Sequence, residues 1–344
     1  MHLRFHSTHG QILDHELQIS LHELMEAFIQ EIIPHEKPTP FEDHKRVWEK
    51  PFDQYELRRF FVFIDGILAG YICFFWAADD VKNSHTVQCE LLYILKPYRQ
   101  KGLGKALLKF ALEALQKEGF GSASLKSYEN VKAGHHFVSQ LEATHDLDSR
   151  VNRLVLQDVN RNYIQSALER APMDRFILGC FDEMYPESEL EARCELINVM
   201  ETAPRSASRE YYRIDAQYMR NYLEHLQFHG IVSWFMYVKE RATQRYVGYT
   251  EIHYAPSNPS EIRQLGTGVL PEYRGFGLGS WLKAAMLDRI LKERPHAEYI
   301  NSDNDNVNDP ILHINARLGF RILVQVHYWQ INIVRALETL SAIK

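Results

Sequence analysis

The sequence predicts an α+β protein built from two similar domains. A glycine-rich turn occurs twice, as KPYRQKGLG at 96–104 and as PEYRGFGLG at 271–279. The chain has 344 residues, which is more than one hydrophobic core usually serves. Strand-like and helix-like runs follow one another without strict βαβ alternation, and that mixture is typical of an α+β sheet.

The two glycine-rich turns are in register over a long stretch of chain. Arg99 and Arg274 are 175 positions apart (274 − 99 = 175). The same offset relates two glycine pairs and two apolar pairs: Gly102 and Gly277, Gly104 and Gly279, Leu103 and Leu278, Leu115 and Ile290. One Arg-x-x-Gly-x-Gly is weak evidence, because glycine turns before helices are common. Two copies in register predict a duplicated domain, so we divide the chain into domains 1–158 and 175–344, joined by a linker at 159–174.

The elements of the first domain follow from periodicity and turn signals. The Asp65-Gly66 pair between two β-rich runs is a strong hairpin signal. We expect strands at 3–6, 59–64, 68–76, 87–95, 122–127 and 151–157, and helices at 18–33, 42–50 and 130–141, with another helix directly after the glycine turn.

The second domain repeats this order after a polar, mostly helical connector. We expect strands at 176–180, 232–239, 246–254, 262–270, 298–302 and between 321 and 333, and helices at 187–199, 216–228, after the glycine turn and from about 310. Each glycine turn therefore joins a strand to a helix.

Composition excludes several classes of protein. Apolar residues make up 45% and charged residues 24% of the chain, as in soluble globular proteins. A formal net charge of -6 argues against general nucleic-acid binding, which needs a basic face. There is no run of ~18 apolar residues and no signal-peptide core after Met1, so we expect no membrane association. Four scattered cysteines without a Cys-x-x-Cys pair favour a reducing cytoplasm.

The glycine turns have the chemistry of a phosphate site. Glycines allow a sharp turn and a close approach of the backbone to a ligand. The first helical turn leaves N–H groups without partners at the positive end of the helix dipole, which suits a pyrophosphate. A Walker loop is excluded because Gly104-Lys105 is followed by Ala106. A dinucleotide fingerprint fits poorly, because neither copy has the third glycine at its spacing.

A Tyr-Arg-x-x-Gly-x-Gly turn between a strand and a helix resembles the acetyl-CoA pyrophosphate loop of the GNAT superfamily of N-acetyltransferases. Two such halves resemble the tandem GNAT proteins, the group that includes mycothiol synthase. The second half adds similarity at 247–251, at 264–269 and at 308–320, which resemble the third strand, the fourth strand and the last helix of a GNAT domain. The resemblance implies two GNAT domains, each a mixed, mostly antiparallel sheet flanked by helices.

The resemblance also implies acetyl-CoA as cofactor and a primary amine of a small molecule as acceptor, in a monomer or homodimer. It places the cofactor against both turns and the strands before them. The residues that it implies for cofactor binding are Val269, Leu270, Arg274, Gly275, Phe276, Gly277, Leu278, Gly279, Ser280, Asn304 and Asn308 in the second half, and Ile94, Leu95, Arg99, Gln100, Lys101, Gly102, Leu103, Gly104 and Lys105 in the first.

We expect the general base in the second half, which carries more of the pattern. Tyr249, Glu251 and His253 alternate on one expected strand and so share a face. A carboxylate in such a run is costly unless it is paired or faces a cleft. We therefore expect Glu251 to be the base and His253 the second candidate, while a solvent-facing carboxylate at the sheet edge stays open as the alternative.

Glu90 is the candidate base of the first half. It precedes Arg99 by nine residues, a position at which GNAT enzymes often place their base, whereas Leu265 stands there in the second half. Many GNAT enzymes also protonate the leaving thiolate with a tyrosine seven residues after an asparagine that opens the last helix. Counting from Asn130 gives Phe137 and counting from Asn308 gives Asn315, so the general acid stays open.

One alternative to catalysis by the second half follows from these departures. An acyl-CoA sensor without turnover is the alternative function, because both tyrosine positions are occupied by other residues. A metal site is not expected, because the 17 histidines and four scattered cysteines form no zinc-binding motif in the sequence. A calcium loop in the acidic segment 303–314 is excluded, since glycine and glutamate are missing from its sixth and twelfth positions.

Overall fold

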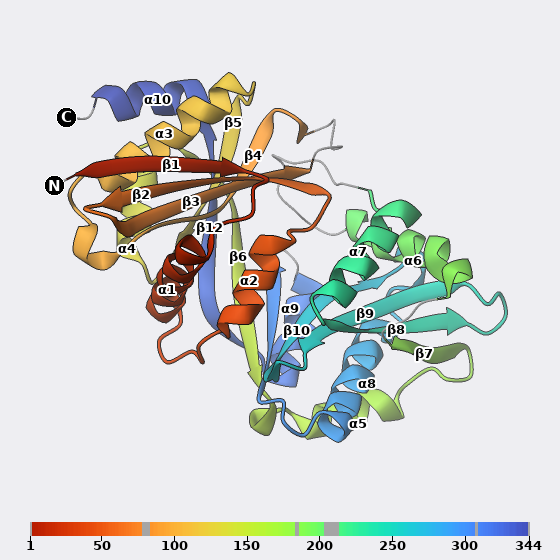
Figure 1. The fold of residues 1–344 in the computed structure, drawn as a ribbon. Helices are drawn as coiled ribbons and strands as arrows, with labels where there is room; N and C mark the ends of the chain where they lie inside the picture. Colours follow the sequence, from red (N-terminus) through yellow and green to blue (C-terminus); the bar gives the residue numbers. More distant parts are fainter. Residues whose placement is uncertain (1, 78–82, 183–185, 203–212, 307–308, 343–344) are drawn as a thin grey trace. The chain divides into compact units, whose positions relative to one another are not determined.

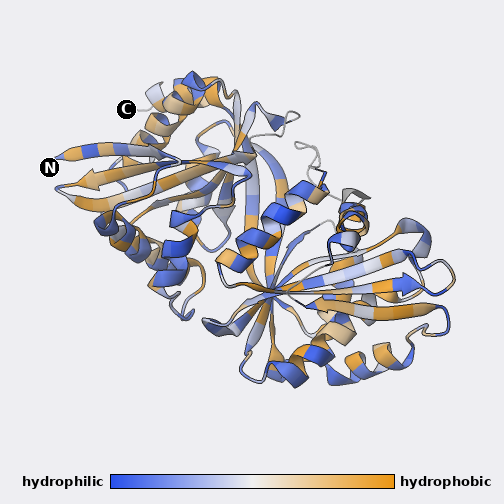
Figure 2. Cartoon of the chain, turned by 45° about the vertical axis from the view of Figure 1, so that its right-hand side comes forward, coloured by the Kyte–Doolittle hydropathy of each residue, from blue (hydrophilic) through white to orange (hydrophobic). Residues whose placement is uncertain are grey.

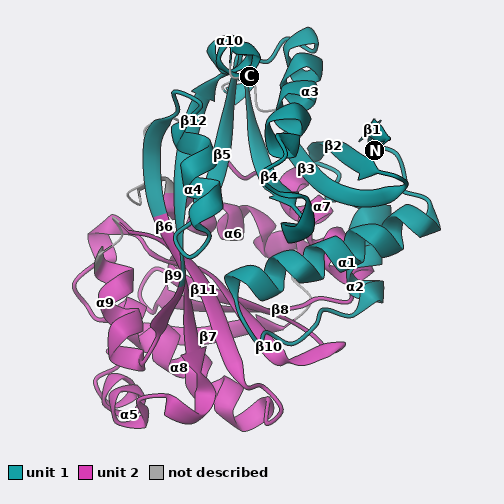
Figure 3. Ribbon diagram, turned by 90° about the vertical axis from the view of Figure 1, so that its left-hand side faces the viewer, with its two compact units in different colours: residues 1–148, 206–210, 324–344 teal, residues 149–205, 211–323 magenta. Residues whose placement is uncertain are grey.

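The structure is a computed structural model that describes residues 2–77, 83–182, 186–202, 213–306 and 309–342 (Figure 1). It divides into two compact units, coloured separately in Figure 3. Unit 1 comprises residues 1–148, 206–210 and 324–344, and unit 2 comprises 149–205 and 211–323. Each unit contains one of the two glycine-rich turns.

Unit 1 is a mixed sheet with helices on both faces. Its strands run in the order β1 (Leu3–His9), β2 (Tyr55–Ile64), β3 (Ile67–Ala77), β4 (Thr86–Ile94), β5 (Ser122–Tyr128) and β12 (Arg321–Asn332, of which 324–332 belong to this unit). The β4–β5 pair is parallel, and the other four pairings are antiparallel. Its helices are α1 (His15–Ile32), α2 (Phe41–Glu49), α3 (Leu103–Lys117), α4 (Lys132–Ser139) and α10 (Ile333–Ala342).

The alternation of side chains along β2 divides the core of unit 1 into two layers. Phe60 and Val62 pack with α3 and α10, whereas Phe61 and Phe63 pack with α1 and α2 on the opposite face. This is the two-residue period of a strand that is buried on both faces. Figure 2 shows apolar residues along the strands and polar residues on the outer sides of the helices.

Unit 2 repeats the arrangement. Its strands run in the order β6 (Thr144–Val155, in this unit from Ser149), β11 (Tyr299–Asp305), β10 (Asn258–Val269), β9 (Tyr246–Ala255), β8 (Val232–Glu240) and β7 (Phe176–Asp182). The β10–β11 pair is parallel and the others are antiparallel. Its helices are α5 (Arg161–Glu169), α6 (Leu190–Ile197), α7 (Ala216–Phe228), α8 (Leu278–Glu293) and α9 (Asp309–Leu318). The expected α+β class with mixed, mostly antiparallel sheets is confirmed.

The last strands of the two halves are exchanged. From Ser149 onward β6 pairs with β11 of unit 2, although it follows directly after the elements of unit 1. Conversely β12, the last strand of the chain, pairs with β5 of unit 1. The compact units therefore differ from the division 1–158 and 175–344, which follows chain order. The order of elements along the chain does not predict which strand the last strand of each half pairs with.

The C-terminal helix α10, which the sequence analysis did not anticipate, completes the core of unit 1. Ile333, Ala336 and Leu340 are buried in the same cluster as Leu107 and Leu112 of α3. Within the described residues, no helix is long and apolar enough to cross a membrane.

We predict that Ala336→Asp destabilises unit 1 selectively. The substitution places an unpaired charge in a fully buried position, which costs about 3–5 kcal/mol. Hydrogen exchange should show lost protection in β2–β5 and retained protection in β8–β10. Val334→Asp is the matched control, because Val334 is 47% exposed on the same helix and should tolerate the charge. Equal loss of protection in both units would contradict the assignment of α10 to unit 1.

Candidate active site

The parallel strands separate beside each glycine-rich turn. In unit 2, pairing joins Glu261–Gln264 of β10 to Tyr299–Ser302 of β11. From there β11 stays paired with β6 up to Asp305, while β10 continues to Val269 alongside β9. In unit 1, β4 and β5 pair over Thr86–Gln88 and Ser122–Ser124 in the same way. Each unit thus has a parallel strand pair that diverges toward its glycine turn.

A β-bulge lies at the same place in both diverging strands. In β10 the register shifts between Gln264, opposite Ile252, and Thr267, opposite Thr250, so that Leu265 and Gly266 both face Glu251. In β4 the shift lies between Cys89 and Leu91, which makes Glu90 the extra residue. The offset of 175 relates Glu90 to Leu265. Bulges turn backbone groups out of a ladder, and they occur often beside active sites.

Both glycine turns are exposed and open at the helix N-terminus. Gly102 and Gly277 precede α3 and α8 with φ of +75° and +78°. Within the described part of the chain, neither helix has a side-chain cap, and a Cβ built on either glycine meets no atom within 4 Å. The first N–H groups of each helix therefore face open space at the positive end of its dipole.

The residues of the two turns differ in burial and in backbone conformation. Leu103 and Leu278 are buried under their helices. Gln100 takes a left-handed conformation at φ +59° where the second copy has Gly275 at +86°. The loop residues Lys101, Phe276 and Gly275 are exposed, and Gly104, Lys105, Gly279 and Ser280 are half-buried at the start of the helices. Ser280 Oγ accepts a hydrogen bond from Tyr163 at 3.1 Å.

The arginine of each turn ties the loop to the strand that precedes it. Arg99 Nε donates to the carbonyl of Ile94 at 2.7 Å, and Arg274 Nε donates to that of Val269 at 3.1 Å. In unit 1 the rest of the guanidinium forms a bidentate pair with Glu31, at 2.8 and 2.7 Å. Leu95 and Leu270 are the next residues of these strand ends, and each backbone N–H bonds across to β3 or β9. Arg99 is thus a fixed structural clamp in this conformation.

Glu251 lies in a buried network on the α6 face of β9. Its Oε1 accepts hydrogen bonds from Arg193 at 2.9 Å and Ser233 at 2.8 Å, and it lies 3.2 Å from His253 Nε2. The Tyr222 hydroxyl is 3.1 Å from the same nitrogen of His253. Burial raises the pKa of Glu251, but the Arg193 charge and the His253 and Ser233 contacts outweigh it and hold the pKa below its ordinary value. Such a carboxylate is a weak base.

Glu90 has a different environment from Glu251. Its side chain is 58% exposed, and Lys126 Nζ lies 3.9 Å from it. It lines a cavity of about 50 Å³ in the diverging region of unit 1, together with Phe28, Tyr93, Lys126 and Tyr128. The bulge therefore turns this carboxylate toward the space between β4 and β5.

Lys126 and Tyr128 are site residues that sequence reasoning missed. Both lie on β5 beyond its parallel pairing with β4, and that position was their only signal. Burial is the main cause that raises the pKa of Tyr128, to about 12. Its phenol is therefore protonated at neutral pH.

The asparagines of unit 2 meet at one carbonyl oxygen. Asn304 Oδ1 accepts hydrogen bonds from Asn315 at 3.0 Å, Asn152 at 3.1 Å and Ser302 at 3.4 Å. Asn308, the expected helix-opening residue, lies outside the described residues. In unit 1 Phe137 approaches Gly104, its Cε2 lying 3.7 Å from a Cβ built there, and in unit 2 Ile314 approaches Gly279 in the same way, at 3.4 Å. The last helix thus reaches the glycine turn of unit 1 through an apolar contact.

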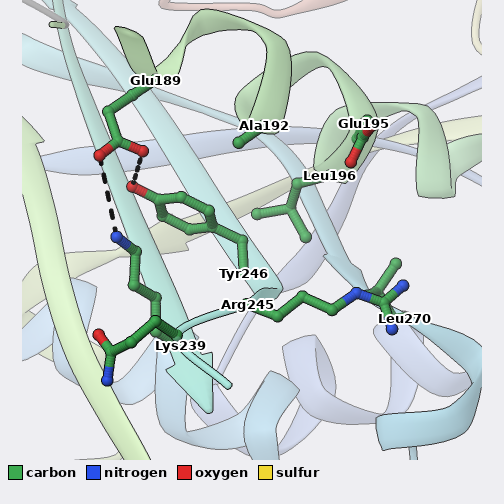
Figure 4. Close-up of a pocket in the computed structure, with 9 residues that line it drawn as sticks. Glu189, Ala192, Glu195, Leu196, Lys239, Arg245, Tyr246 and Leu270 are labelled. Carbon is green, nitrogen blue, oxygen red and sulfur yellow. Dashed lines mark hydrogen bonds and ion pairs between the residues drawn. The ribbon is translucent and has the colours of Figure 1, made fainter. Parts of the chain in front are cut away.

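A cavity in unit 2 lies on the α6 face of the β8–β9 turn (Figure 4). Its volume is about 410 Å³, and Leu270 at the end of β10 forms part of its wall. Two acidic and two basic side chains line it: Glu189, Glu195, Lys239 and Arg245. Glu189 accepts a hydrogen bond from Tyr246 at 2.7 Å and lies 4.0 Å from Lys239. The pocket suits a small ligand that carries both charges.

The two units also differ at Lys283, which lies in the helix after the second glycine turn. It is 1% exposed in α8, and among the described residues its Nζ has no hydrogen-bond partner. The ring of Phe320 lies 5.3 Å away. Burial lowers the pKa of Lys283 to about 7. Leu108 occupies the position related by the 175-residue offset in unit 1 and is fully buried.

Comparison with known proteins agrees with this geometry. Residues 21–141 match the model of the acetyltransferase (GNAT) family, and no curated protein matches the sequence. A tandem GNAT protein from the clavulanic acid biosynthesis pathway has a similar structure, with 20% identity and a TM-score of 0.79 over 96% of this chain and 99% of that one.

Two further structures have the same fold. A GCN5-related N-acetyltransferase from Sphaerobacter thermophilus is 14% identical, with a TM-score of 0.67 over 96% of both chains. A glucosamine N-acetyltransferase region of a fungal multi-domain β-N-acetylglucosaminidase is 16% identical, with a TM-score of 0.65 over 96% of this chain and 38% of that one. At these identities the similarity establishes the fold.

We predict that Lys283→Leu stabilises the protein. The folded pKa of about 7 lies below the unfolded value of ~10.4, so between these values only the unfolded state binds the proton. The lysine therefore destabilises the fold fully below pH 7, and less and less as pH rises toward 10. Lys283→Leu should raise the free energy of unfolding by about 3–5 kcal/mol at pH 7.

The measurement is chemical denaturation of both proteins at pH 7 and pH 10, where the difference between them should shrink. Lys292→Leu is the matched control on the same helix, because this side chain is 69% exposed and its loss should change little. A Lys283→Leu protein that is less stable than the wild type at pH 7 would contradict the burial of an uncharged amine.

Proposed function

From the tandem GNAT fold of the chain we propose that it is an acyl-CoA-dependent N-acyltransferase. The reaction would transfer acetyl from acetyl-CoA to a primary amine of a small molecule. The observation that carries the proposal is the pair of exposed glycine turns, each at a helix N-terminus beside diverging parallel strands. A diphosphate fits the N–H groups of such a turn. The pantetheine arm would then run along β4 or β10 toward the bulge.

The chemistry places one demand on the protein. The thioester is already activated, whereas an alkyl amine with a pKa of ~10.4 is protonated at pH 7. Reaching the neutral amine costs roughly 4–5 kcal/mol, at ~1.36 kcal/mol per pH unit. A base placed directly or through one water relieves part of this cost and contributes typically ~10²–10⁴ in rate. Backbone N–H groups at the bulge are suited to the oxyanion that forms on the thioester carbonyl.

We assign the base to Glu90 in unit 1. Its carboxylate is accessible, sits at the bulge and lines the cavity between the diverging strands. Tyr128 in the same cavity is the candidate acid that protonates the leaving thiolate, in place of the tyrosine that is absent at position 137. The family match over 21–141 covers the same half.

The second half, which the sequence analysis expected to carry the chemistry, is the other candidate for the transfer step. It has the larger pocket, whose mixed charges suit an amine that also carries an acidic group. Its expected base is less suited, because Glu251 is 4% exposed and paired with Arg193. His253, at 9% exposure between Tyr222 and Glu251, is the second candidate base of this half. We therefore propose acetyl-CoA binding in both halves and transfer in unit 1.

An acyl-CoA sensor without turnover is the second candidate function. Phe137 and Asn315 favour it, because neither side chain donates a proton as a tyrosine does. Thiol release from acetyl-CoA across a panel of amines separates the two functions. Bound acetyl-CoA without turnover on any amine would support the sensor.

We predict that Glu90→Gln lowers kcat/KM by about 10²–10⁴ while acetyl-CoA affinity is kept, because the amide cannot accept the proton. The measurement is thiol release on the best amine of the panel, with calorimetry for binding. Glu251→Gln is the comparison variant. It leaves Arg193 buried without its carboxylate, so it should cost about 3–5 kcal/mol of stability and change the rate less than Glu90→Gln does. Unchanged turnover in Glu90→Gln, with activity lost in folded Glu251→Gln, would move catalysis to unit 2.

A further inference from the structure

Two helices of unit 1 bring three metal-ligand side chains together away from the cavity that contains Glu90. His22 and Glu26 are one turn apart on α1, and His44 is on α2. One ligand atom of each lies within 4.8 Å of the other two. The Nδ1 atoms of His22 and His44 are 2.9 Å apart. At that distance at least one of the two nitrogens is unprotonated, so a lone pair is directed into the cluster.

We propose that His22, Glu26 and His44 form a binding site for a divalent transition-metal ion of the zinc type, which ties α1 to α2. Two imidazoles and one carboxylate are a donor set that Zn²⁺ accepts, with a fourth position left for water. Tetrahedral geometry with Zn–N bonds of ~2.0–2.1 Å places two nitrogens roughly 3.3 Å apart. The two rings need to separate by only about 0.4 Å to admit the ion.

The surroundings hold the three side chains in place. Phe41 packs edge-on against the His22 ring at 5.4 Å, and Trp48 lies 5.4 Å from the His44 ring. Glu26 Oε1 accepts a hydrogen bond from the Thr39 backbone N–H at 3.2 Å. Such outer contacts orient metal ligands and contribute to metal affinity. All three ligands are half-buried, so water and an ion can reach them.

Charge also favours a cation at this position. The Glu26 carboxylate supplies one negative charge toward the dication.

A second cluster in unit 1 has a similar composition and a different geometry. His145 Nε2 and His327 Nδ1 both lie 2.7 Å from the same oxygen, Oδ1 of Asp148. Burial raises the pKa of Asp148, and the two histidine hydrogen bonds outweigh it and lower the pKa. Here both rings hydrogen-bond to one carboxylate oxygen, so their nitrogens face the carboxylate rather than each other. It provides a matched control within the same chain.

A metal at the α1–α2 site has a consequence for the glycine turn of unit 1. Helix α1 also carries Glu31, which holds the Arg99 guanidinium and accepts a hydrogen bond from Tyr93 at 2.8 Å. Joining α1 to α2 would restrain the helix that positions this clamp. The site itself does not depend on the proposed acyl transfer.

The test is Zn²⁺ binding to the tag-free full chain at pH 7.5, measured by competition with a chromogenic chelator. We expect one equivalent to bind tightly, with affinity at least tenfold weaker in His22→Gln and in His44→Gln. His145→Gln and His327→Gln should bind as the wild type does. Equal weakening by all four variants, or wild-type affinity no higher than that of His44→Gln, would overturn the proposal.

Cobalt spectroscopy makes the test independent of how the variants fold. Co²⁺ bound to the wild-type chain should give the intense visible bands of a four-coordinate site with nitrogen and oxygen ligands, and Zn²⁺ should displace it. Zn²⁺ should also raise the melting temperature of the wild type but not that of His22→Gln. A weak octahedral spectrum of hydrated cobalt, with no thermal shift by Zn²⁺, would show that the two histidines form a hydrogen bond only.

Discussion

The separation of two parallel strands is the constraint on which the candidate site depends. β4 and β5 are joined over three residue pairs, and β10 and β11 over four, before each pair diverges. Beyond that point β5 pairs with β12, and β11 pairs with β6, so each of these strands is held on its other side. The exchanged final strands thus stabilise the divergent edge that a lone parallel pair would leave unpaired. The bulges at Glu90 and Leu265 begin where the ladder ends, and the glycine turns lie at the ends of the released strands.

Duplication has left two copies of one scaffold with different chemistry inside it. Unit 1 has Glu90 at the bulge, Leu108 in the helix after the turn and Phe137 in the last helix. Unit 2 has Leu265 and Lys283 at the first two positions, and Ile314 contacts its glycine turn. Unit 1 thus has an accessible carboxylate at the bulge and an apolar side chain in the helix after the turn. Unit 2 has an apolar side chain at the bulge and a buried amine in that helix. The glycine turns at the helix N-termini are the same in both, and in the proposed function binding and transfer are divided between the halves.

The sequence predicted the parts of this structure that have a local signal. The glycine turns, the hairpin at Asp65-Gly66 and the shared face of Tyr249, Glu251 and His253 follow from backbone freedom and strand period, and the structure confirms them. The sequence left open whether Glu251 is buried, because its partner Arg193 is 58 residues away on another element. The strand exchange, the cavity around Glu90 and the meeting of His22 with His44 depend on tertiary contacts. The spacing of His22 and Glu26 in the sequence places them on one face of a helix, but no local sequence signal places His44 beside them.

The central claim is that open N–H groups at the two helix N-termini hold the diphosphate of coenzyme A. Calorimetric titration with acetyl-CoA tests it on the wild type and on Gly102→Asp and Gly277→Asp, with Gly102→Asn and Gly277→Asn as matched controls. Asparagine and aspartate both tolerate the left-handed conformation at φ +75° and +78°, and both have open space for a side chain. Only aspartate places a negative charge where the diphosphate would lie. The account predicts two equivalents bound by the wild type, one lost in each aspartate variant and both retained in the asparagine variants. Aspartate variants that bind acetyl-CoA as the wild type does would contradict it.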